Sequence, residues 1–180
     1  NVERAELSSQ ATNLEAYLQS LDMVLTFSPF DEMGCARIAQ LINKSNQFNL
    51  TTRRYTEAQV AAMPNDSSLF TLQVRLRDRF GDNGMISVVI CRTKETDWEI
   101  DLWLMSCRVL KRNVEHAVLN EIMSAARTRK IAMVRGVYVP TAKNGLVTRH
   151  YHDLGFNCSA TEESGVTHWE IGVATYQSIE

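Results

Sequence analysis

The sequence is organised around residues 97–119, which are Asp-Trp-Glu-Ile-Asp-Leu-Trp-Leu-Met-Ser-Cys-Arg-Val-Leu-Lys-Arg-Asn-Val-Glu-His-Ala-Val-Leu. The first part of this segment, 98–105, alternates between two sets of side chains, which predicts a β-strand. Residues 106–112 carry three cationic side chains and no long apolar run. From Asn113 onward the apolar residues recur at helical spacing. The segment is therefore expected to form a strand, a basic turn and a helix.

A turn that leads from a strand into a helix is a common binding site for anions. The first N–H groups of a helix have no partner within it, and the helix dipole adds partial positive charge. Arg108, Lys111 and Arg112 supply charged donors at this point. The sequence therefore predicts a phosphate-binding turn, with a solvated basic turn as the alternative.

Composition limits the class of protein. The chain has 180 residues, of which 44% are hydrophobic, so one domain with a real core is expected. Its 19 basic and 21 acidic residues give no general electrostatic attraction for nucleic acid. No apolar run approaches the ~20 residues of a membrane span. The four cysteines have no CxxC spacing and the histidines no shared metal spacing, so we expect free thiols in the cytoplasm and no metal.

Periodicity and turn residues predict the remaining elements. The expected helices begin near residues 12, 31, 56, 113 and 144. The expected strands are 23–27, 69–77, 85–90, 98–105, 131–139 and 166–174. Gly81–Gly84 has residue types that strongly favour a turn, and it lies between two of these strands. The order indicates an α+β (mixed α/β) fold, a sheet flanked by helices, with a ligand crevice where the chain leaves the 97–105 strand.

Residues 47–55 are polar, aromatic and basic without a clean period. We expect a loop held by specific contacts, which is a common place for binding residues. Asn49, Arg53 and Arg54 are candidates for contacts with a substrate or a carrier. A purely structural anchoring of the loop is the alternative.

The order of elements resembles the GNAT acyltransferase fold, a mostly antiparallel central sheet flanked by helices. Arg108–Asn113 stands where that family has its pyrophosphate-binding turn, Arg/Gln-x-x-Gly-x-Gly/Ala. Asn144, Tyr151 and Gly155–Phe156 match its pattern Asn…Tyr-x-x-x-Gly-Phe. The resemblance implies an acyl-CoA N-acyltransferase fold.

Three longer motifs resemble the C-terminal domain of the FkbH-like proteins (HAD superfamily, subfamily IIIC). They are Asn46–Thr56, Asp78–Gly84 and Met105–Leu110, and the likeness runs over most of 15–175. It implies that 1–180 is a single GNAT-like domain, the C-terminal part of a longer chain with an upstream HAD-type domain. In that family the upstream domain dephosphorylates a glyceryl phosphate donor, and the glyceryl group is loaded onto an acyl carrier protein in polyketide or related biosynthesis.

The resemblance implies a thioester carried on phosphopantetheine, on a carrier protein or on CoA. The residues expected to bind it are Met105, Ser106, Cys107, Arg108, Val109, Lys111, Arg112, Asn113 and Asn144. Lys111 and Asn113 replace the glycines of the GNAT turn, and a side chain at 111 obstructs the close approach of a pyrophosphate. The single phosphate of a carrier-borne arm suits the turn better, with Lys111 as a ligand.

Four residues are candidates for the chemistry. Tyr151 resembles the general acid of the GNAT family. The alternative is that Tyr151 only packs its ring in the protein. Glu99 and Asp101 are expected on one side of their strand, where either is a candidate base; acids on a solvent face are the alternative. Cys107 lies near the helix start, where a thiolate is stabilised, so it is a candidate acyl carrier; a small buried thiol is the alternative.

A second class of function stays open. The alternative is a non-catalytic module of a degenerate GNAT fold that docks a carrier protein. Carrier proteins are usually acidic, so cationic side chains are expected to steer them. The candidates for this steering are Arg53, Arg54, Arg75 and Arg77.

Overall fold

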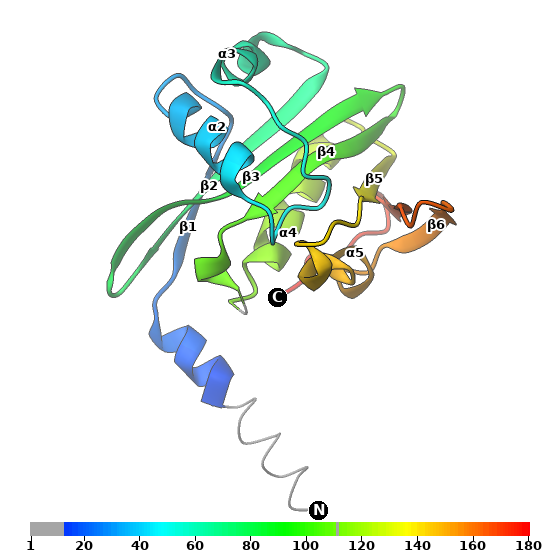
Figure 1. Ribbon diagram of the computed structural model, residues 1–180. Helices are drawn as coiled ribbons and strands as arrows, with labels where there is room; N and C mark the ends of the chain where they lie inside the picture. The colour runs from blue at the N-terminus through cyan, green and yellow to red at the C-terminus, as the bar shows by residue number, and fades with distance from the viewer. Residues whose placement is uncertain (1–12, 111) are drawn as a thin grey trace, which may run out of the picture.

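The computed structural model describes residues 13–110 and 112–180, which form a seven-stranded sheet with helices on both faces (Figure 1). The strands are β1 (Val24–Ser28), β2 (Leu69–Asp78), β3 (Gly81–Lys94), β4 (Asp97–Met105), β5 (Met133–Tyr138), β6 (Asn157–Thr161) and β7 (Thr167–Gly172). Their order across the sheet is β1-β2-β3-β4-β5-β7-β6. β4 and β5 pair in parallel, and the other neighbours are antiparallel. The predicted mixed α/β fold with a mostly antiparallel sheet is confirmed.

The helices expected near residues 56 and 113 begin within one residue of those positions. The helix expected near residue 31 begins at residue 35 instead, and a 3-10 turn precedes the last helix, which begins at residue 150 instead of near 144. Residues 13–20 are helical. The further helices are α2 (Cys35–Lys44), α3 (Glu57–Ala62), α4 (Val114–Thr128) and α5 (His150–Asp153), with 3-10 turns η1 (Met63–Asn65), η2 (Cys107–Val109) and η3 (Gly145–Val147). The capping box of Thr56 and Gln59 is formed in both directions. Thr12, the predicted cap of the first helix, lies outside the described residues.

Two apolar clusters hold the layers together, one on each face of the sheet. On one face α4 packs Val118 and Ile122 against the strands, in a cluster that also holds Ile100. On the other face α2 packs Ile38 and Ile42 against β3 and β4. Burial of each such side chain contributes about 1.5–3 kcal/mol. In the part of the chain described, no helix is long and apolar enough to cross a membrane.

β4 contains a β-bulge at Asp101. Cys91 of β3 lies opposite Ile100 and Ile90 lies opposite Leu102, so Asp101 has no partner on β3. An extra residue reverses the alternation of the strand beyond it. The predicted alternation over 98–105 is therefore wrong beyond Asp101. The β4 residues that share the α4 face are Trp98, Ile100, Trp103 and Met105.

β4 and β5 pair over half of β4 and then diverge. Their register runs from Asp97 opposite Met133 to Ile100 opposite Gly136. Both strands continue beyond this pair. Backbone N–H and C=O groups in such an opening need partners, and an extended segment can supply them.

Candidate functional site at the opening between β4 and β5

The chain's own residues 48–50 fill the opening between β4 and β5. The amide of Met105 donates to the carbonyl of Phe48 at 3.1 Å, and the amide of Leu50 donates to the carbonyl of Trp103 at 3.2 Å. On the other side the amide of Val139 donates to the carbonyl of Leu50 at 2.8 Å. The segment thus bridges the two diverging strands. An extended ligand cannot pair with these groups, so the opening between the two strands is closed at its centre.

Asn144 braces this segment. Its amide nitrogen donates to the carbonyls of Asn49 at 3.0 Å and Val139 at 2.9 Å. Its oxygen accepts from the amide of Thr141 at 2.8 Å. The side chain is fully buried. The structure therefore gives Asn144 protein partners, and its contact with a cofactor stays a prediction.

The loop that leads into the opening is fixed by its own polar side chains. Asn49 donates to the carbonyl of Ser45 at 3.2 Å and accepts from the amide of Thr52 at 2.9 Å. Arg54 donates to the carbonyls of Ile42 and Ser45. The specific contacts expected for residues 47–55 are present. Asn49 and Arg54 act as structural anchors in this arrangement, and their contact with a substrate stays a prediction.

A hollow of about 750 Å³ lies at the end of β4, beside the filled opening. Its floor is apolar and consists of Leu41, Phe48 and Met105, all of them buried. Its remaining lining residues are Lys44, Ser45, Asn46, Gln47, Ser106, Cys107, Ala142 and Lys143. Three residues predicted to hold the arm, 105–107, therefore border one cavity. Arg108, Val109, Arg112 and Asn113 do not line it.

The Cys107 thiol is free and exposed. It begins η2, directly after β4. The alternative of a small buried thiol is wrong, because this turn runs over the surface. A role in acyl transfer stays a prediction.

The basic turn is joined to the β2–β3 hairpin. Arg112 pairs with the carboxylate of Asp78 at 3.1 Å, and the Asp78 side chain is 6% exposed. Hydrogen bonds from the Phe80 amide, Asn83 and Arg112 lower the pKa of Asp78. Arg108 is exposed and donates to the carbonyl of Asn83 at 3.3 Å. Arg112 is therefore engaged by the hairpin, whereas Arg108 keeps donors that can face a ligand.

Some features of the start of α4 favour the binding of an anion and others oppose it. Asn113 precedes the helix in the left-handed conformation (φ 58°), which asparagine tolerates, and makes no side-chain cap. Glu115 in the first turn places an acid near the free N–H groups. Val109 is fully buried, so its side chain anchors the turn to the protein core. Lys111 lies outside the described residues.

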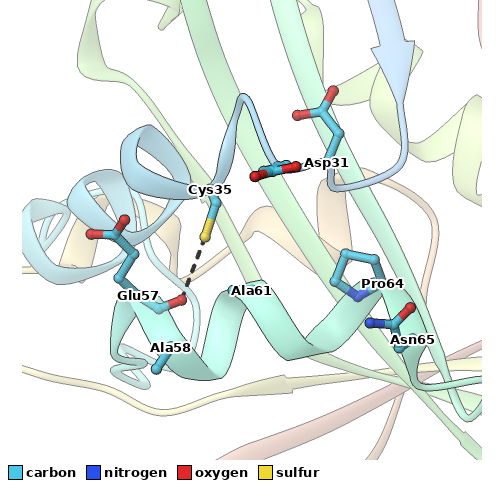
Figure 2. Close-up of a pocket in the computed structure, with 8 residues that line it drawn as sticks. Asp31, Cys35, Glu57, Ala58, Ala61, Pro64 and Asn65 are labelled. Atoms are coloured by element: carbon cyan, nitrogen blue, oxygen red, sulfur yellow. Dashed lines mark hydrogen bonds between the residues drawn. The ribbon is translucent and has the colours of Figure 1, made fainter.

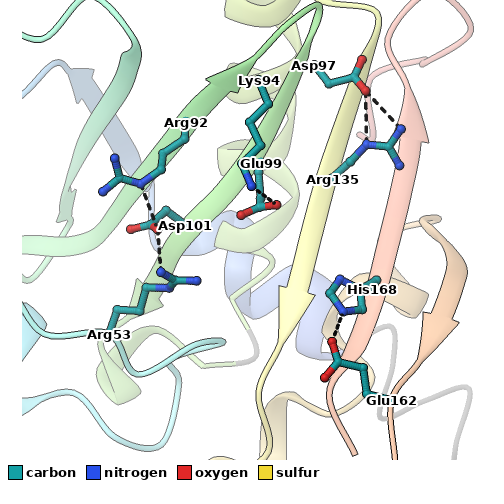
Figure 3. A network of polar contacts seen from close by, with 9 residues as sticks. All are labelled: Arg53, Arg92, Lys94, Asp97, Glu99, Asp101, Arg135, Glu162 and His168. Atoms are coloured by element: carbon teal, nitrogen blue, oxygen red, sulfur yellow. Dashed lines mark hydrogen bonds and ion pairs between the residues drawn. The ribbon is translucent and has the colours of Figure 1, made fainter.

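Asp101 is a buried carboxylate with several partners (Figure 3). It accepts hydrogen bonds from Arg92 at 3.2 Å and from Tyr55, and it forms an ion pair with Arg53 at 3.3 Å. The Asp101 side chain is 1% exposed, while those of Arg53 and Arg92 are 50% and 39% exposed. Burial and the bond to Asp101 raise the pKa of Tyr55. The sequence reasoning missed Arg92 and Tyr55, although Tyr55 belongs to the motif that carries Arg53.

Glu99 is the less engaged of the two candidate bases. It pairs with Lys94 at 3.0 Å and its side chain is 21% exposed. Arg135 lies opposite Glu99 on β5 and forms an ion pair with Asp97 (Figure 3). It also forms an ion pair with Glu170. The two acids therefore belong to one region of charged side chains, but the Asp101 carboxylate has three partners and that of Glu99 has one.

Three buried polar groups without a protein partner meet on the α4 face. They are the Trp103 indole N–H, His150 Nε2 and the Tyr151 hydroxyl, and none has a hydrogen-bond partner among the described residues. The rings of Trp103 and His150 lie 4.4 Å apart, centroid to centroid, and those of His150 and Tyr151 lie 5.3 Å apart. Burial lowers the pKa of His150 to about 3 and raises that of Tyr151 above its ordinary value. All three groups are therefore neutral near pH 7.

The Tyr151 ring is packed tightly against β5. A Cβ atom built at Gly136 would lie 2.4 Å from Tyr151 Cζ, so glycine is needed there for the ring. The expected ring packing is thus present. The role of the hydroxyl as an acid stays a prediction. His150 was missed because one histidine beside a predicted tyrosine carries no spacing signal.

A separate hollow lies between α2 and α3 and has an acidic rim (Figure 2). Asp31, Glu32 and Glu57 line it, and the Cys35 thiol donates to the carbonyl of Glu57 at 3.4 Å. Burial and the nearby Glu57 raise the pKa of Cys35, which keeps the thiol neutral. In residues 13–110 and 112–180 no cluster of His, Cys, Asp and Glu can hold a metal ion.

The order of the sheet, the diverging β4–β5 pair and the succession β4, η2, α4 define the fold of the GNAT acyltransferases. Solved structures share this fold. The ribosomal-protein-S18-alanine N-acetyltransferase from Escherichia coli matches with a TM-score of 0.61 at 13% identity, over 86% of this chain and 97% of that chain. A GNAT acetyltransferase from Streptococcus pneumoniae matches with a TM-score of 0.64 at 12% identity, over 83% and 99%.

A third structure, of spermidine N-acetyltransferase from Vibrio cholerae in complex with CoA and spermine, matches with a TM-score of 0.60 at 11% identity, over 83% and 96%. Identities this low show the fold alone. No model of a protein family and no curated protein matches the sequence. The expected GNAT-like fold is confirmed, and the likeness to FkbH-like proteins stays a prediction.

Proposed function

We propose that this domain is an acyltransferase that acts on an acyl or glyceryl thioester carried on phosphopantetheine. The observation that carries the proposal is the hollow beside Met105, Ser106 and Cys107, at the end of β4 in a GNAT fold. An apolar floor below a polar rim is typical of a site for a small organic ligand. The amides of the arm suit the rim, and its acyl end suits the floor.

A carrier-borne arm fits the turn better than CoA does. Arg112 is paired with Asp78, and Glu115 stands in the first turn of α4, so a pyrophosphate meets fewer free donors and one acid. A single phosphate needs fewer contacts. Arg108, Lys111 and the start of α4 are the groups we assign to it.

The chemistry requires a base for the acceptor and an acid for the leaving thiolate. Glu99 is the better base, because proton uptake by Asp101 would break bonds to Arg53, Arg92 and Tyr55. Tyr151 is the proposed acid. Its hydroxyl is buried and has no hydrogen-bond partner in the described chain, so no protein group holds its proton.

The proposal extends to the biological setting through the sequence motifs. An acyl carrier protein is the proposed partner, and a HAD-type domain upstream in the same chain is proposed to supply the glyceryl group. Polyketide or related biosynthesis in the cytoplasm is the corresponding setting. These parts depend on the resemblance to FkbH-like proteins and not on the fold.

A second function is favoured by a specific observation. Residues 48–50 close the opening, and Asp101 is saturated with donors, as expected if the fold has kept its shape without its chemistry. The domain would then dock a carrier protein for another domain. Arg53, Arg75 and Arg77 are exposed and suit an acidic partner.

Turnover separates the two functions. The purified domain is incubated with a phosphopantetheinyl carrier thioester and an acceptor, and loss of the thioester is followed by mass spectrometry. An acyltransferase consumes the thioester, and Glu99→Gln and Tyr151→Phe slow it by about 10²-fold or more each. Unchanged turnover in both variants would remove these assignments. No turnover despite carrier binding would favour the docking role.

A further inference from the structure

The side chain of Phe48 separates two hollows. The first is the cavity of about 750 Å³ at the end of β4, whose floor includes Phe48 with Leu41 and Met105. The second, of about 270 Å³, lies between the start of α4 and α5, and Phe48 lines it together with His150. Phe48 is the residue common to both linings. Because its buried ring also contacts His150, which lines the second hollow, we place the ring as a wall between the two cavities.

The backbone of Phe48 is held independently of its ring. The Phe48 carbonyl accepts from the Met105 amide at 3.1 Å, and the next residue is braced by Asn144 at 3.0 Å. The ring is buried and meets the edge of the His150 ring, with centroids 5.2 Å apart. A smaller side chain at position 48 would therefore remove the wall and leave the segment in place.

The second hollow suits a hydrocarbon chain. Its inner lining contains Leu110, Val147 and Leu154, with Leu146 half-exposed at its edge. His150 is neutral near pH 7, because burial lowers its pKa to about 3. The other lining residues are Glu115, His116, Arg149 and Asp153, which are partly or fully exposed. An apolar chain that passed Phe48 would thus find apolar walls.

We propose that the Phe48 ring limits the length of the acyl group that the domain accepts. The acyl end of the arm lies on the floor of the first hollow and stops at the ring. Short groups such as acetyl or glyceryl fit in front of it. A long chain such as octanoyl must displace the ring or stay in water, and either choice weakens binding. This inference rests on the proposed function, because it requires the arm to enter the first hollow.

The test compares acyl-pantetheines of increasing chain length by calorimetry. The probes are acetyl-, butyryl-, hexanoyl- and octanoyl-pantetheine, used with the wild-type domain and with Phe48→Ala. The wild type is expected to bind acetyl-pantetheine at least about tenfold more tightly than octanoyl-pantetheine. Phe48→Ala is expected to abolish or reverse that preference. Circular dichroism and the thermal midpoint check that the variant is folded.

Two further variants make the test decisive. Phe48→Leu removes less of the wall than Phe48→Ala does. It should therefore reduce the preference for short acyl groups in part, and it replaces Phe48→Ala in the test if that variant does not fold. Leu146→Trp fills the second hollow from its exposed edge, so adding it to Phe48→Ala or Phe48→Leu should restore the wild-type preference. Equal binding of all chain lengths by the wild type, or an unchanged preference in the folded Phe48 variants, would overturn the inference and leave the arm site standing. No binding of any pantetheine to the wild type would reject the arm site and the inference together.

Discussion

The amide of Met105, the last residue of β4, donates to the carbonyl of Phe48 at 3.1 Å. This bond joins the end of the central strand to a loop that lies far earlier in the sequence. It explains why the motif around Phe48 is long: its residues pair with two strands and carry the side chains that fix them. The opening of the GNAT fold is thus closed at its centre, and a ligand is left with the hollow at the end of β4.

Loss of the Asn144 side chain should loosen this arrangement. Asn144→Ala leaves the carbonyls of Asn49 and Val139 without a donor, which should lower the free energy of unfolding by about 1–3 kcal/mol. Urea denaturation measures it. Asn157→Ala, at an exposed site of β6, is the matched control and should change little. Equal stability of both variants would contradict the bracing role.

The neutral state of His150 predicts a specific pH dependence. Its pKa is lowered from 6.5 to about 3 by burial, so the unfolded chain binds a proton that the folded one excludes. The stability linked to His150 is therefore present above pH 6.5 and is lost as the pH falls toward 3. Relative to His150→Phe, the wild type should lose about 3 kcal/mol of unfolding free energy between pH 7 and pH 4.

Urea midpoints at several pH values test this dependence. The exposed His152→Phe is the control and should keep the wild-type curve. Parallel curves for the wild type and His150→Phe would mean that His150 has the same pKa in the folded and the unfolded chain, which would contradict its neutral, buried state.

Gly136 is needed for the ring of Tyr151. Gly136→Ala places a methyl group 2.4 Å from Tyr151 Cζ, and the ring is buried, so we expect a loss of about 1–3 kcal/mol of stability. Gly145→Ala is the matched control, because nothing lies within 4 Å of its added Cβ. The added substitution Tyr151→Leu should recover part of the loss. Thermal denaturation of the four proteins is the measurement, and equal midpoints for the two alanine variants would refute the packing.

The basic turn predicts different behaviour toward two ligands. Lys111→Gly combined with Asn113→Gly should weaken binding of a phosphopantetheinyl carrier by about 1–3 kcal/mol, and less at high salt. Asn113 has φ 58°, so glycine is tolerated there. Calorimetry with the carrier and with CoA gives the result. Tighter CoA binding by this variant would show that the turn still suits a pyrophosphate.

Most regular elements were predictable because their signals are local, but the turn expected at Gly81–Gly84 is wrong, since these residues belong to β3 and the chain turns at 79–80. Alternation indicated the strands, and the Thr56–Gln59 capping box indicated the start of α3. β6 gave no such signal, since all its residues are exposed and no apolar face marks it. The bulge at Asp101 depends on the register with β3, which a single strand does not reveal.

The candidate site was predictable in part. The sequence singled out residues 105–107, which border one cavity, and residues 47–55, which are held by specific contacts. It did not reveal that residues 48–50 enter the opening, because an irregular segment has no period. The ion pair of Arg112 with Asp78 was also missed, since a pair between the turn and a distant hairpin exists only in the folded chain.

The central claim is that a phosphopantetheine arm enters the hollow at the end of β4. Calorimetry with one carrier protein, prepared with and without its arm, tests it most directly. Ala142→Trp narrows the hollow at an exposed position of its lining, and Ala160→Trp on β6 is the control. The wild type and Ala160→Trp should bind the armed carrier at least about tenfold more tightly than the bare one, and Ala142→Trp should lose that preference. Equal binding of both carriers by the wild type, or a full preference in Ala142→Trp, would contradict the claim.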